Sequence, residues 1–125
     1  MGTSFNLPNA YSACYDLLLM FYKELGRLPR DVKYTLLERM KSSLVHIAAL
    51  IFEANINWDK TPYLIEARGT LMEVMVGLRL LYDLHYINED TNTRFAEKME
   101  DLSKQLTAWY KYQNKSAHSQ NSASL

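Results

Sequence analysis

Few residues in this 125-residue chain have side chains suited to catalysis or metal binding: it has three histidines and one cysteine. Di-iron helical bundles hold their metal with Glu-x-x-His pairs. The residue three positions before each histidine is Ser43, Tyr82 or Lys115, never a glutamate. No two histidines lie four residues apart, and Cys14 has no basic neighbour in the sequence that would activate its thiol. We therefore expect no metal, no cofactor and no enzymatic activity.

The basic residues are a stronger signal because they are grouped. The segment from Lys23 to Lys41 contains six positive and three negative side chains, and no acidic residue follows Asp101. The whole chain is neutral, with 14 basic and 14 acidic residues, so net charge alone does not indicate nucleic-acid binding. Either these groups are ordinary solvated faces, or they contact nucleic acid or a partner protein. The candidate contact residues here are Arg30, Lys33, Arg39, Lys41 and Lys111.

A long helix is predicted over 61–87, beginning with a Thr61 cap and Pro62 in its first turn. Apolar residues alternate at steps of three and four, the spacing of helices that pack at shallow angles. A second apolar set lies far around the same helix, which indicates more than one packing neighbour. The first set is Leu64, Ala67, Leu71, Val74, Leu78 and Leu81, and the second is Ile65, Met72, Val76 and Leu80.

Two arginines border these apolar sets. Arg68 and Arg79 are eleven residues apart and therefore lie on one side of the predicted helix. They are candidate phosphate or partner contacts. The alternative is that each pairs with a nearby acid, such as Asp83 four residues after Arg79.

Three further amphipathic helices complete the predicted fold. They run from Asn9 to Leu25, from about Pro29 to Asn55, and from an Asn88 cap to about Tyr112. Val45 and Phe52 belong to a second apolar set on the middle one. Short connections predict an all-α, antiparallel up-down-up-down four-helix bundle.

The predicted domain organisation is an irregular N-terminus at 1–8, the bundle at 9–112, and a disordered tail at 113–125 whose polar composition cannot support a packed core. His85 is expected to continue the third helix. The single cysteine suits a reducing compartment, and neither a signal peptide nor a membrane-spanning run is visible. We therefore expect a cytoplasmic protein.

The order of these features resembles a known family. The run 27–36 (RLPRDVKYTL) is followed by IFEA at 51–54, EAR at 66–68, LRLLYDL at 78–84 and WYK at 109–111. Together they resemble the accessory variability determinant proteins of diversity-generating retroelements. That family belongs to a wider group of small bacterial four-helix proteins, which includes the ribosomal RNA intervening-sequence proteins.

The resemblance implies a homopentameric, barrel-like assembly that binds the retroelement's reverse transcriptase and RNA or DNA. Such a protein supports mutagenic copying of template RNA into cDNA without catalysing it. Arg68 and Arg79 match basic positions of the family pattern. The expected oligomer interface is Ile65, Met72, Val76, Leu80, Val45 and Phe52. The alternative is a self-assembling bundle of the intervening-sequence type with no reverse transcriptase partner.

Overall fold

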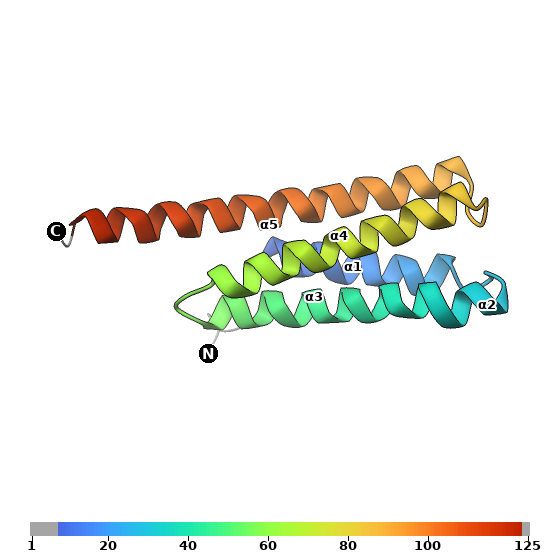
Figure 1. Ribbon diagram of the computed structural model, residues 1–125, viewed down its shortest axis with the longest axis horizontal. Helices are drawn as coiled ribbons and strands as arrows, with labels where there is room; N and C mark the ends of the chain where they lie inside the picture. The colour runs from blue at the N-terminus through green and yellow to red at the C-terminus, as the bar shows by residue number, and fades with distance from the viewer. Residues whose placement is uncertain (1–7, 124–125) are drawn as a thin grey trace.

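The computed structural model describes the backbone of residues 8–123 and the side chains of residues 8–115. α1 spans Asn9–Glu24, α4 spans Thr61–Asp83 and α5 spans Glu89–Ala123 (Figure 1). Between α1 and α4, three segments follow one another directly and make one helix. They are α2 (Arg30–Val32), the π-helical turn η2 (Lys33–Leu37) and α3 (Glu38–Ile56).

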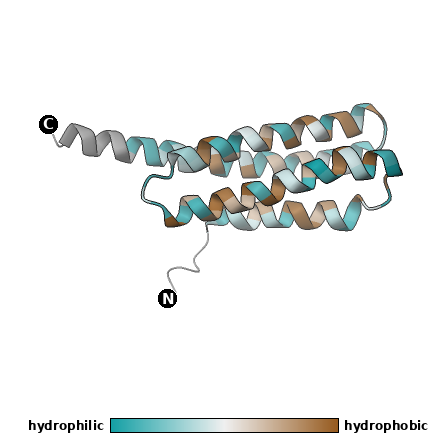
Figure 2. Cartoon of the chain, turned by 60° about the horizontal axis from the view of Figure 1, so that its bottom comes forward, coloured by the Kyte–Doolittle hydropathy of each residue, from teal (hydrophilic) through white to brown (hydrophobic). Residues whose placement is uncertain are grey.

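These helices form an antiparallel bundle, as predicted. α1 and α4 each pack mainly against α3 and α5, so α1 and α4 occupy diagonal positions. Apolar and polar residues alternate along the helices, which is the pattern of amphipathic packing (Figure 2). The core is fully enclosed at Phe21 of α1 and Phe95 of α5, whose rings meet edge to face with centroids 5.2 Å apart. The all-α, up-down-up-down fold class is confirmed.

The start of α4 differs in detail from the prediction. Thr61 is the first helical residue, and its hydroxyl caps nothing; its backbone N–H instead donates a hydrogen bond to the Asp59 carboxylate at 3.3 Å. The preceding Lys60 ammonium donates to the carbonyl oxygens of Ala54 and Asn57 at 2.8 and 2.7 Å. A cation at these unpaired carbonyls stabilises the C-terminus of α3 and fixes the turn into α4.

The end of α4 also requires a correction, because the helix stops at Asp83 and does not reach Ile87. His85 has a left-handed backbone (φ 65°) and an exposed side chain. Its N–H bonds the Tyr82 carbonyl at 3.0 Å, and the Tyr86 N–H bonds the Leu81 carbonyl at 2.9 Å. This is a Schellman motif, so His85 ends the helix that the sequence predicted it to continue.

α5 begins as predicted but ends later. The Asn88 side chain accepts a hydrogen bond from the Thr91 N–H at 2.8 Å, which confirms the predicted cap. The end predicted near Tyr112 is corrected, because the helical backbone continues to Ala123 beyond the other helices (Figure 1). The last fully buried side chain of α5 among the described residues is Leu106. Tyr112 therefore marks the limit of packing rather than of the helix.

The predicted boundary at the N-terminus falls mostly outside the described residues. Pro8 is extended (φ −64°, ψ 158°) and precedes the first helical residue, Asn9. The expectation of an irregular segment at 1–7 lies outside the part of the chain that the structure describes.

Candidate functional site

The strongest concentration of cations lies where α1 turns into α2 and along the start of α3. We call residues 23–41 the basic corner. Among the residues that the structure describes, no cation of this segment forms an ion pair with a carboxylate. Of the six, Lys33 is half-buried and Lys41 is buried, and the other four are exposed: Lys23, Arg27, Arg30 and Arg39.

Three acids at the same end of the bundle pair with cations outside the basic corner. Arg94 of α5 binds Glu24 of α1 at 2.6 Å and Asp90 of its own helix at 3.3 Å. The hydrogen bond from Arg94 lowers the pKa of Glu24 below its ordinary value. Asp83 is bound by Arg79 at 2.9 Å. Glu24, Asp90 and Asp83 are thus paired with Arg94 and Arg79, and not with the cations of the basic corner.

Two exposed tyrosine rings lie among these cations. Tyr34 has the Arg30 guanidinium carbon 5.8 Å and the Lys33 ammonium 5.7 Å from its ring centre. Tyr22 has the Lys41 ammonium 4.0 Å from its ring centre. Arg30 lies four positions before Tyr34, so helical spacing could have found that contact, whereas Lys33, one position before, could not be found from spacing. The contact between Tyr22 and Lys41 joins α1 to α3 and could not be found that way.

Arg68 and Arg79, the first candidate contacts from the sequence, both have partners within the chain. Arg68 is half-buried, and its guanidinium lies 5.0 Å from the ring centre of Tyr110 on α5. Arg79 donates from Nε to Asp83, as the alternative interpretation required, but its side chain remains 77% exposed. An exposed pair of this kind contributes little to stability. Neither arginine belongs to the basic corner, and Lys111 lies exposed toward the far end of α5.

The second apolar set of α4 lies in solvent. Its four members are about half exposed, and we call them the α4 face: Ile65 (52%), Met72 (59%), Val76 (59%) and Leu80 (44%). Gly69 falls within this stripe, with no heavy atom within 4 Å of the position its Cβ would take. A glycine inside a helix costs roughly 1 kcal/mol relative to alanine, and packing within this chain does not explain it.

A second exposed apolar surface, the α1–α3 face, consists of Tyr15, Val45 and Phe52, which are 46–52% exposed. Val45 lies one turn after Lys41, the residue that contacts Tyr22, and Phe52 lies two turns further along the same side of α3. This face therefore borders α1, whereas the α4 face lies on the diagonally opposite helix. The residues predicted as one interface form two surfaces on different sides of the bundle.

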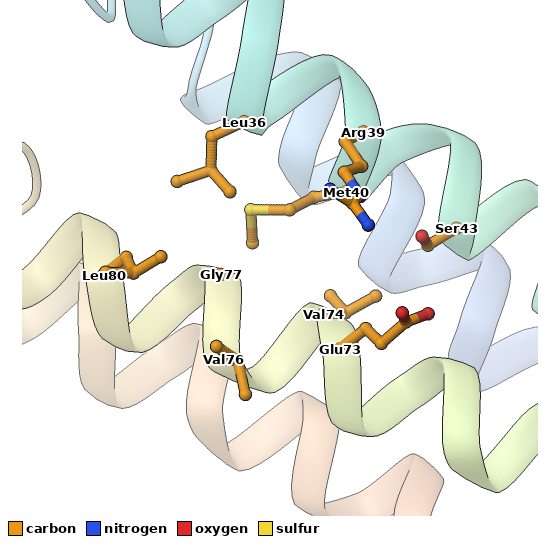
Figure 3. A pocket seen from close by; sticks show the side chains of 9 residues that line it. All are labelled: Leu36, Arg39, Met40, Ser43, Glu73, Val74, Val76, Gly77 and Leu80. Carbon is orange, nitrogen blue, oxygen red and sulfur yellow. The ribbon is translucent and has the colours of Figure 1, made fainter.

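A groove of about 280 Å³ separates α3 from α4 and opens beside the α4 face (Figure 3). The Met40 thioether reaches from α3 to Gly77 of α4, where an added Cβ would lie 2.7 Å from the sulfur. Gly77 thus permits a close helix approach within the chain. Val76 and Leu80 line the groove and are also members of the α4 face.

The residues first considered for chemistry have structural contacts. Cys14 donates its S–H to the Leu44 carbonyl at 3.3 Å, and burial raises its pKa to about 12. His46 contacts Glu66 across α3 and α4 at 2.5 Å. Within the described part of the chain, no three histidine, cysteine or carboxylate side chains are grouped as a metal site would require. No helix there has the length and apolar character needed to cross a membrane.

Comparison with known protein families finds a match over most of the chain. The model of the bAvd-like family matches residues 11–113, which include all of α2, η2, α3 and α4 and most of α1 and α5. The chain belongs to the bAvd-like family. This confirms the resemblance drawn from the sequence. No protein with a curated description shows significant similarity to the chain.

Proposed function

We propose that the chain is a non-catalytic accessory subunit of a diversity-generating retroelement. In this role it binds the retroelement's reverse transcriptase and its RNA, with DNA as a related ligand, and supports mutagenic cDNA synthesis. Membership of the bAvd-like family supports the role. The observation that carries the nucleic-acid part is the basic corner, whose cations have no carboxylate partners in the described structure.

Local charge explains how a neutral protein holds a polyanion. Arginine and lysine side chains that replace the counterions of phosphate groups gain free energy from counterion release, whatever the charge elsewhere on the protein. Arg30 and Arg39 are exposed, and a guanidinium can meet two phosphate oxygens at once. Arg79 lies outside the corner, and its exposure suits contact with the reverse transcriptase.

The proposed assembly is a closed homopentamer. The α4 face and the α1–α3 face leave large apolar side chains in water on a small subunit, which favours association. Because the two faces differ and lie on different sides, the contact between copies is head-to-tail, and a head-to-tail contact must close into a ring to stay finite. A ring repeats the basic corner once per subunit, which multiplies a modest local charge.

RNA binding at varied salt tests the proposal. Fluorescence anisotropy of a labelled RNA should show binding that weakens steeply as salt rises. Arg30→Gln together with Lys33→Gln should weaken binding and lower the slope of log K against log salt by roughly 1–1.5, because each lost single-strand phosphate contact removes about 0.7. The matched control is Lys98→Gln with Lys104→Gln on α5, which removes the same charge and should leave the slope nearly unchanged.

The same chain should also form a complex with the reverse transcriptase of its own retroelement when the two are expressed together. Absence of RNA binding by the parent, or an equal effect of the control variant, would contradict the nucleic-acid part. Absence of the complex would contradict the transcriptase part.

A further inference from the structure

The basic corner carries aromatic rings as well as charge, and the rings bear on which nucleic acid it binds. Tyr34 is 61% exposed and Tyr22 is 57% exposed. Neither ring packs on another aromatic ring in the described structure, and each has a cation near its ring. A large exposed ring near cations that have no carboxylate partner suits a ligand that has both a flat surface and negative charge.

We propose that Tyr34 is a stacking platform for an unpaired base, and that the basic corner therefore binds single-stranded RNA or DNA in preference to duplex. The inference rests on the proposed nucleic-acid role of the same corner. The Arg30 guanidinium and the Lys33 ammonium lie over the Tyr34 ring, 5.8 and 5.7 Å from its centre. When a base stacks on the ring, these flexible side chains are near enough to bind the phosphates that flank it. Proteins that bind single strands combine a basic surface with aromatic rings in this manner.

The local backbone favours this use of Tyr34. The five residues of η2 form a π-helical turn, a feature found frequently at functional sites. Leu37 of this turn is fully buried, whereas Tyr34 and Thr35 are exposed. The turn thus anchors the start of the long helix through Leu37 and leaves the tyrosine ring in solvent.

A second ring extends the surface. Lys41 is only 7% exposed, and its ammonium has no hydrogen-bond or ion-pair partner among the described residues, only the Tyr22 ring at 4.0 Å. Lys41 follows Tyr34 by seven residues along the same continuous helix. The basic corner therefore offers two exposed phenol rings, each with a cation over it, which suits a strand with successive unstacked bases.

Duplex nucleic acid cannot use these rings in the same manner. Its bases are already stacked on one another, and a protein side chain reaches their faces only after they are unpaired or splayed apart. The carboxylates of Asp31 and Glu38 in the same segment reduce its excess charge, so phosphate contacts alone make a weak site. Stacking adds affinity that a duplex does not receive.

The test compares a labelled single-stranded RNA of about twelve nucleotides with a duplex of the same length, using anisotropy and the full chain. Tyr34→Leu should weaken single-strand binding about ten-fold, within the range measured for a lost base stack. Duplex binding and the salt slope should stay unchanged, because a neutral ring releases no counterions. Tyr34→Trp should retain single-strand binding, and Tyr112→Leu, at another exposed tyrosine, should have no effect.

The inference is overturned if Tyr34→Leu binds the single strand as tightly as the parent, or weakens both ligands equally. It is also overturned if the variant loses only the reverse transcriptase, because the ring then belongs to a protein interface. If the parent protein binds neither the single-stranded RNA nor the duplex, the proposed function is overturned together with this inference. A parent that binds both ligands with equal affinity overturns the inference alone. Circular dichroism of each variant checks that the exposed substitution leaves the fold intact.

Discussion

At the scale of single residues, His85 occupies a left-handed backbone position that usually favours glycine. It is the one residue other than glycine with positive φ among those described, and it closes the Schellman motif after α4. A left-handed conformation costs an L-residue with a Cβ about 1 kcal/mol, which glycine avoids. The exposed imidazole makes no hydrogen bond in the described structure that would offset this cost.

His85→Gly should therefore raise the free energy of unfolding by about 1 kcal/mol, measured by urea denaturation. The matched control is Leu84→Gly, one residue earlier, where φ is −86° and glycine gives no conformational relief. That control should lower stability. If both substitutions destabilise the protein equally, backbone strain at His85 is not the cause.

The sequence allowed some single-residue roles to be predicted and not others. The burial of the Cys14 thiol can be predicted, because its position on the apolar stripe of α1 is a local property of the helix. His85 could not be placed, because its spacing continued the α4 stripe by one more step. Whether a helix ends there depends on carbonyl groups and on the next helix, neither of which spacing records.

At the scale of elements, the link between Glu24 of α1 and Arg94 of α5 should make stability depend on pH. The hydrogen bond from Arg94 lowers the pKa of Glu24 from its ordinary value of 4.5, so the folded chain binds this proton less tightly than the unfolded chain does. The stabilisation is complete above pH 4.5 and is lost as pH falls through the lowered pKa.

Denaturation of the parent and of Glu24→Gln over a pH series tests this link. The parent should lose more stability than the variant between about pH 5 and pH 3, because the variant has no carboxylate to protonate. Glu100→Gln is the control, since Glu100 meets Lys104 only within α5 and at 3.6 Å. Parallel curves for the parent and Glu24→Gln would show that the link contributes nothing.

Except at the end of α5, helix positions were predictable to within a few residues, because amphipathic periodicity and the Asn88 cap are encoded locally. The π turn at Lys33–Leu37 and the Lys60 contacts to α3 were not. Both depend on how the chain returns against a neighbouring helix. The same applies to Arg79, for which spacing identified Asp83 as a partner but could not decide that the pair forms.

At the scale of the whole molecule, the two exposed apolar faces predict a head-to-tail contact between copies. The parent should be a closed ring, five subunits by family resemblance. Val45→Asp with Phe52→Asp disables the α1–α3 face, and Met72→Asp with Val76→Asp disables the α4 face. Each double variant alone should be monomeric, and the fold should survive because all four side chains are exposed.

Mixing the two double variants should give a dimer and nothing larger, because each copy keeps one intact face and only one contact can form. Sedimentation or light scattering measures this directly. A parent-sized assembly from either double variant alone would show that its face is not used. A mixture that stays monomeric would show that the two faces do not meet each other.

The sequence predicted both apolar sets on these faces, because a helix that is apolar on two sides is recognisable from periodicity. It could not show that the sets form separate surfaces. That depends on α1 and α4 taking diagonal positions in the bundle. It likewise showed the grouping of the basic residues along the chain but could not show that Arg94 of α5 binds Glu24.

The central claim is that the chain supports copying of RNA by a reverse transcriptase without catalysing it. The direct measurement is cDNA synthesis from template RNA by the purified reverse transcriptase of the same retroelement, with and without this chain. The account predicts abundant cDNA only when both proteins are present, none from the chain alone, and a marked loss with Arg30→Gln/Lys33→Gln. Equal cDNA synthesis by the reverse transcriptase alone would contradict it.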